Sequence, residues 1–224
     1  MSLTPELVAR TLKPVPEEGP EPRWTPIQED ELDALVRRII EESNNEPLWI
    51  FAYGSLVWNP DFDFDAKDIG TVYGWHRSFS LHIERWRATS EQPGLMLALE
   101  RGGTCKGIAF RMQQPPKPDD LRRLLAREIR YREVAPMVKW VDVHTASARR
   151  KALTFWASSQ THQLTAPLSL EKAAALIAVA CGPAGSCAQY LHNTVSHLEA
   201  AGIRDRNLWR LQQLVADEIA RSPA

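Results

Sequence analysis

No apolar run in the sequence approaches the about 18 to 20 residues that a helix needs to cross a bilayer. The first 22 residues contain several prolines and acids and lack the apolar core of a secretory signal. They are also too acidic for an Arg-rich transit peptide. We therefore expect no membrane partner and predict a cytoplasmic protein.

Neither sign of charge is in excess, and cysteine is scarce. Lys and Arg total 27 against 28 Asp and Glu, so no broad basic surface favours a nucleic acid partner. Cys105, Cys181 and Cys187 form neither a CxxC pair nor a Cys/His pattern, which argues against a zinc site or a disulfide framework. We interpret them as reduced packing thiols rather than as a nucleophile, because no motif supplies a partner histidine.

The chain is long enough for one substantial domain with a buried core, at 224 residues of which 44% are hydrophobic. Residues 1–27 are rich in proline, which breaks helical runs, and we interpret them as an N-terminal arm. No linker divides the remainder, so we predict a single domain over residues 28–224. The sequence gives no oligomeric state.

Hydrophobic periodicity predicts helices and strands in separate blocks. Apolar residues at three- and four-residue steps predict helices over 28–43 and 118–130, and three more after residue 167, the first capped by Ser169. Alternating runs between residues 48 and 158 predict strands over 48–53, 69–75, 78–83, 95–100, 105–112, 138–143 and 151–156. This order indicates an α+β fold, a small mixed sheet or barrel flanked by helices.

Glu128 is the most informative charged residue. Leu121, Leu124 and Leu125 form the apolar stripe of the 118–130 helix, and position 128 continues that stripe. A carboxyl group in such a slot tends toward a raised pKa, which suits acid–base chemistry near neutral pH. The alternative is a helix-end glutamate that reaches solvent or pairs with a neighbouring arginine.

A second signal is the segment WIFAYGSLVWNP at residues 49–60, an apolar strand that runs into a Gly54-Ser55 turn. Consecutive backbone N–H groups in such a turn can hold an anion such as a carboxylate, although most strand-Gly-Ser turns are only turns. With its flanks, the segment resembles the substrate-binding loop of the ChaC-type, glutathione-specific γ-glutamylcyclotransferases. Further stretches resemble that family in the same order over residues 48–215, namely GWHRSFSL at 74–81, QPG at 92–94, MLAL at 96–99, GIAFR at 107–111, Arg127-Glu128 with Pro136, GPAG at 182–185 and QYL at 189–191.

The resemblance implies a γ-glutamylcyclotransferase-like fold and an enzyme that cleaves glutathione, without a metal or other cofactor, to 5-oxoproline and cysteinylglycine. The family's catalytic carboxylate lies in an Arg-Glu pair that falls on Arg127-Glu128, so Glu128 is implied as the acid–base residue. The implied substrate-binding residues are Ala52, Tyr53, Gly54, Ser55, Leu56 and Val57.

The sequence departs from the family pattern at three places. Leu95 follows Pro93-Gly94 where the family has arginine, Cys187 stands where an asparagine is expected, and a Gly-containing segment after the catalytic glutamate is replaced around Val134. Tyr131 is a candidate for the tyrosine of that segment, and we interpret the nearby Glu133 as structural. These departures leave two alternatives open, a cyclotransferase that acts on another γ-glutamyl amine and a non-catalytic γ-glutamyl-binding protein.

Overall fold

A computed structural model describes residues 1–17, 19–114, 117–158 and 164–221. The chain forms two compact units. We call residues 20–76 and 99–156 the barrel unit, and residues 1–19, 77–98 and 157–224 the helical unit. The single domain over residues 28–224 stays a prediction. Within the described ranges, no helix combines the length and the apolar character that a membrane crossing requires.

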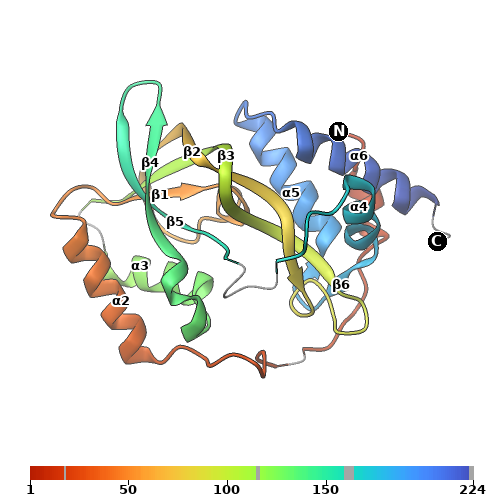
Figure 1. Cartoon of the computed structure of the whole chain (residues 1–224), viewed down its shortest axis with the longest axis horizontal. Helices are drawn as coiled ribbons and strands as arrows, with labels where there is room; N and C mark the ends of the chain where they lie inside the picture. The colour runs from red at the N-terminus through yellow and green to blue at the C-terminus, as the bar shows by residue number, and fades with distance from the viewer. Residues whose placement is uncertain (18, 115–116, 159–163, 222–224) are drawn as a thin grey trace. The chain divides into compact units, whose positions relative to one another are not determined.

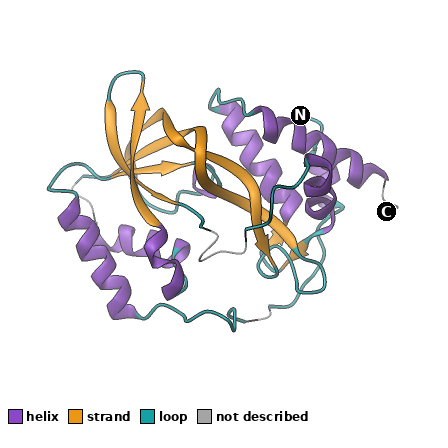
Figure 2. Cartoon of the chain, viewed as in Figure 1, coloured by secondary structure: helices purple, strands orange, loops and turns teal. Residues whose placement is uncertain are grey.

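The barrel unit is built on a closed five-stranded barrel with the strand order β1-β3-β2-β4-β5 (Figures 1 and 2). Strand β1 pairs antiparallel with β3 and parallel with β5, where Ile50 lies opposite Leu153. Strands β4 and β5 form an antiparallel hairpin. The predicted α+β class with a mixed barrel is therefore confirmed. The strands are β1 (Trp49–Ala52), β2 (Phe64–Ile83), β3 (Gly94–Met112), β4 (Val138–Thr145) and β5 (Arg149–Phe155).

Two of these strands are longer than the sequence predicts. The separate strands predicted over 69–75 and 78–83 are one strand, β2, and those predicted over 95–100 and 105–112 are one strand, β3. Gly74, Gly102 and Gly103 have φ values of 79°, 100° and 73°, which only glycine adopts easily. These glycines are therefore local irregularities inside continuous strands.

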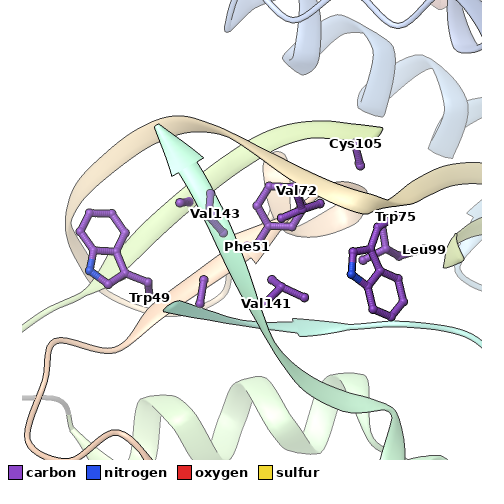
Figure 3. Close-up of a cluster of buried hydrophobic side chains, with 10 residues drawn as sticks. Trp49, Phe51, Val72, Trp75, Leu99, Cys105, Val141 and Val143 are labelled. Carbon is purple, nitrogen blue, oxygen red and sulfur yellow. The ribbon is translucent and has the colours of Figure 1, made fainter. Parts of the chain in front are cut away.

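The barrel interior holds a cluster of buried apolar side chains (Figure 3). Trp49 and Phe51 of β1 alternate into it, as do Val141 and Val143 of β4. Val72 and Trp75 of β2 are three residues apart, which strict alternation would place on opposite faces. The left-handed backbone at Gly74 between them lets both side chains point inward.

Two helices of the barrel unit, α2 (Glu29–Glu42) and α3 (Pro118–Glu128), pack against each other, and they match the helices predicted over 28–43 and 118–130 (Figure 1). Arg122 of α3 bonds Asp33 at 2.8 Å and Glu29 at 2.7 Å, both on α2. Short 3-10 helices, η1 (Ser55–Val57) and η2 (Arg132–Met137), follow β1 and α3.

The helical unit packs α1 (Pro5–Ala9), α4 (Leu170–Val179), α5 (Cys187–Ala200) and α6 (Arg206–Arg221) together, with a hairpin of β6 (Cys181–Gly182) and β7 (Gly185–Ser186). Ser169 caps α4 as predicted. The proline-rich stretch that we interpret as an N-terminal arm contains the short helix α1. Pro5 begins that helix, where its missing N–H costs nothing, and Thr4 caps it. Cys105, Cys181 and Cys187 are all buried and not disulfide-bonded, as expected of packing thiols.

Candidate active site

Glu128 is the last residue of α3. Leu121, Leu124 and Leu125 are buried beneath the helix, as the stripe predicts, and Glu128 follows on the same face. Its side chain remains 21% exposed. The side chain is therefore mostly withdrawn from water, although part of its surface remains exposed.

The environment of Glu128 favours the protonated carboxyl group. Burial raises its pKa above the ordinary value for glutamate, and the positive charges of Arg127 and Arg130 offset only part of that increase. Its position at the C-terminal end of α3 acts in the same direction, because the negative end of the helix dipole disfavours a carboxylate. A carboxyl group with these properties holds its proton to a higher pH than an ordinary glutamate, which suits a general acid–base residue.

Arg127 connects Glu128 to the loop after β1. Its Nε lies 3.2 Å from Oε1 of Glu128. Nη2 donates to Oγ of Ser55 at 3.1 Å, and Nη1 donates to the carbonyl oxygen of Asn59. All three guanidinium nitrogens are thus engaged, and the planar group fixes the loop and the carboxyl group relative to each other.

The six residues implied in substrate binding form one continuous stretch from the end of β1 through η1. Ala52, Leu56 and Val57 bury their side chains, so they can reach a ligand only through backbone groups. Tyr53 is partly buried and packs against the barrel core. The turn is closed by bonds from the Val57 N–H to the Gly54 carbonyl at 3.0 Å and from the Asn59 N–H to the Ser55 carbonyl at 2.8 Å.

The segment after α3 is occupied with internal contacts. The Tyr131 ring is buried, and its hydroxyl oxygen accepts a hydrogen bond from the Glu21 N–H at 2.8 Å. Glu133 accepts the Thr25 N–H with both carboxylate oxygens, 3.1 Å each. The interpretation of Glu133 as structural agrees with these contacts. Sequence reasoning did not predict that residues 21–27 contact this segment, because no local pattern links segments more than 100 residues apart.

The fold has solved counterparts. A crystal structure of a γ-glutamyl cyclotransferase specific to glutathione from yeast superposes with a TM-score of 0.66 at 16% identity, covering 78% of this chain and 97% of that one. At this identity the likeness concerns the fold alone. The chain therefore has the γ-glutamylcyclotransferase fold.

Sequence comparison gives the family. The profile described as ChaC-like protein matches residues 48–218. The glutathione-specific γ-glutamylcyclotransferase of Escherichia coli K12 is 36% identical over 163 residues, which are 72% of this chain and 70% of that one. The zebrafish glutathione-specific γ-glutamylcyclotransferase 1 is 33% identical over 147 residues, covering 64% and 75%. The chain belongs to the ChaC-like protein family.

Proposed function

We propose that this chain is a γ-glutamylcyclotransferase that cleaves glutathione to 5-oxoproline and cysteinylglycine. The α-amine nitrogen of the γ-glutamyl group attacks its own γ-carbonyl carbon and closes a five-membered lactam. The amide C–N bond to cysteine breaks, and its nitrogen leaves as the amine of cysteinylglycine. The reaction consumes no water and changes no oxidation state, so the proposal includes no metal or other cofactor.

Glu128 is the proposed acid–base residue. As a carboxylate it takes a proton from the α-ammonium group, and as a carboxylic acid it returns the proton to the leaving nitrogen. The observation that carries the proposal is the combination of a raised pKa at Glu128 with its link through Arg127 to the loop after β1. This carboxyl group changes protonation readily and is held beside the segment that is implied in substrate binding.

The stretch from Ala52 to Val57 is the proposed binding site for the α-carboxylate of the substrate. Ala52, Leu56 and Val57 turn their side chains inward, and the Val57 N–H already bonds the Gly54 carbonyl, so we assign this task to the other backbone N–H groups of the stretch. Arg127 holds the stretch through Ser55, so the α-amine of a bound γ-glutamyl group would face Glu128. Such positioning supplies much of the rate acceleration in an intramolecular reaction.

The departures from the family pattern do not point to an acceptor other than glutathione. Leu95 and Cys187 have no exposed surface, and Val134 is only 5% exposed. Burial raises the pKa of the Cys187 thiol to about 12, so it stays protonated at neutral pH. These three residues act as core packing and present no side chain that would select a different acceptor. We also propose that the enzyme works in the cytoplasm as a lyase with a small-molecule substrate and no nucleic acid or membrane partner.

The test is direct. Purified protein is incubated with glutathione without added metal or nucleotide, and 5-oxoproline and cysteinylglycine are followed by mass spectrometry. We expect both products from the wild type and a loss of at least about 10²-fold in Glu128→Gln, as for removal of a general acid–base group. Glutathione affinity of the variant, measured by calorimetry, should change little.

The other outcomes separate the alternatives. Turnover of a γ-glutamyl amine but not of glutathione would contradict the proposed acceptor. Binding without turnover of any member of a γ-glutamyl panel would favour the non-catalytic binding protein.

A further inference from the structure

Residues 21–27 lie along the segment that follows Glu128. Pro26 and Tyr131 form an antiparallel bridge. The Ile27 N–H donates to the Arg130 carbonyl at 3.1 Å, and the Arg132 N–H donates to the Thr25 carbonyl at 2.8 Å. Two stretches far apart in the sequence therefore pair as a short ladder inside the barrel unit.

Side chains reinforce this ladder on both sides. The Tyr131 oxygen accepts the Glu21 N–H, and the Tyr131 ring meets the Trp24 ring edge-on, with 5.2 Å between centroids. The Glu133 carboxylate accepts the Thr25 N–H. The hydrogen bond from Glu133's own backbone N–H, followed by the bond from Thr25, lowers the pKa of Glu133, which favours the ionised, accepting form.

The ladder lies close to Glu128 along the chain, so it affects the position of the Glu128 side chain in the candidate site. Helix α3 ends at Glu128, and Ile129 has already left the helical conformation, with φ −116° and ψ 77°. Ile129 is 1% exposed and cannot turn outward. The orientation of Glu128 at the end of the helix therefore depends on what holds the backbone from Arg130 onward.

We propose that Tyr131 and Glu133 are positioning residues, which bind residues 21–27 and thereby hold the Glu128 carboxyl group toward the loop after β1. The inference rests on the proposed function and extends it to a stretch before the first helix of the barrel unit. In this scheme, residues 21–27 contribute to catalysis because they help to position Glu128. Tyr131 does not donate a proton to the substrate in this scheme, because its side chain is buried and packs against Trp24.

Loss of these contacts has a defined effect on the reaction. When the ladder loosens, the end of α3 frays, and the Glu128 carboxyl group gains water and conformational freedom. The near-attack geometry is then populated less often, which lowers kcat. Binding of the γ-glutamyl group by the loop after β1 is left intact, so KM changes little.

The kinetic test uses the full-length chain with Glu133→Ala and Tyr131→Phe, separately and combined. We expect a decrease in kcat of about tenfold for the double variant, with KM within about twofold of wild type. Glu133→Gln retains one acceptor oxygen and should restore part of the rate. Asp142→Asn is the matched control. It replaces another carboxylate of lowered pKa, bonded to Arg149 at 2.6 Å on the β4–β5 hairpin, and should leave kcat unchanged.

A second measurement needs no turnover and so separates this inference from the proposed function. The Glu128 carboxyl carbon is titrated by NMR in the wild type and in the double variant, and Glu128→Gln identifies its signal. Arg127 and Arg130, the charges that act on Glu128, are present in both proteins. We expect the pKa of Glu128 to move down toward its ordinary value in the double variant, because hydration reverses the effect of burial.

An unchanged Glu128 titration in a double variant whose melting temperature has fallen would overturn the inference, since residues 21–27 would then only stabilise the fold. An unchanged kcat in an active enzyme would overturn it as well. If the wild type turns over no γ-glutamyl compound, the proposed function fails, and the NMR titration still decides whether Tyr131 and Glu133 control Glu128.

Discussion

The Nε atom of Arg127 lies 3.2 Å from Oε1 of Glu128, and the same guanidinium group donates to Oγ of Ser55. Consecutive residues of a helix point about 100° apart, so this pairing requires Arg127 to fold back along the end of α3. The arrangement gives Arg127 two effects. Its charge limits how far burial raises the pKa of Glu128, and its planar guanidinium group fixes the loop that follows β1.

Arg127→Lys separates these two effects. Lysine keeps the charge, but its single ammonium group cannot bond Ser55, Asn59 and Glu128 together. We expect kcat/KM for glutathione to fall by about 10- to 100-fold, equivalent to about 1.4 to 2.7 kcal/mol of transition-state stabilisation. Steady-state kinetics provide the measurement. Arg122→Lys, a replacement on the same helix at a surface pair with α2, should remain within about twofold of wild type, and an equal loss there would point to general damage of α3.

The pH profile should report the raised pKa of Glu128. The proposed reaction begins with the carboxylate form, so kcat/KM should rise with pH through a limb that lies above the ordinary pKa of glutamate. Arg130 lowers that pKa through its charge, and Arg130→Gln should therefore move the limb to higher pH. Initial rates between pH 4 and 9 would show this. A limb that stays in place or moves to lower pH would contradict the assignment of Glu128 as the titrating group.

The sequence predicts those parts of the fold that are encoded locally. Helix α2 and helix α3 each carry an apolar stripe over consecutive turns, and the α4 cap at Ser169 lies next to the helix that it begins. The place of Glu128 follows from the same stripe. Such signals depend on neighbours in the chain, so they are readable without a structure.

Prediction from the sequence is less reliable where one residue type can either interrupt a helix or strand or form part of it. Gly74 bends β2 without ending it, and Pro5 begins a helix instead of preventing one. The pairing of Pro26 with Tyr131 has no local signature at all, because its partners are 105 positions apart (131 − 26) and neither stretch alternates like a strand. The support of Glu128 by residues 21–27 therefore becomes visible only in three dimensions.

Gly107→Ala tests how closely β1 must approach β3 to place the loop. A Cβ atom at position 107 would lie 2.8 Å from the Phe51 ring and would also meet the Ala52 carbonyl oxygen at the end of β1. We expect the variant to lose about 1–3 kcal/mol of unfolding free energy, as overpacked cores do. Urea denaturation followed by fluorescence measures this. At Gly102 an added Cβ meets nothing within 4 Å, but φ is 100°, so Gly102→Ala reports backbone strain alone and should cost less. A Gly107→Ala variant as stable as wild type would show that β1 can move away from β3.

Glu128→Gln should make the folded protein more stable while it removes activity. The pKa of Glu128 is higher in the folded state than in the unfolded chain, so the folded state binds the extra proton. The stability that this proton contributes is complete below the unfolded pKa and is lost as pH rises through the folded pKa. Above the folded pKa the wild type bears the cost of a mostly buried carboxylate, and neutral glutamine does not. We expect the melting temperature of the variant to exceed that of wild type by about 2–4 °C at pH 8, which is about 1 kcal/mol for a chain of this size. The difference should shrink toward pH 4.

Glu42→Gln is a matched control, because Glu42 lies at the end of α2, where its exposed carboxylate accepts the Trp140 Nε1–H at 2.7 Å. This variant should not stabilise the protein. A Glu128→Gln protein that melts below wild type at pH 8 would mean that the ion pair with Arg127 outweighs burial, and the acid–base role of Glu128 would lose its physical basis.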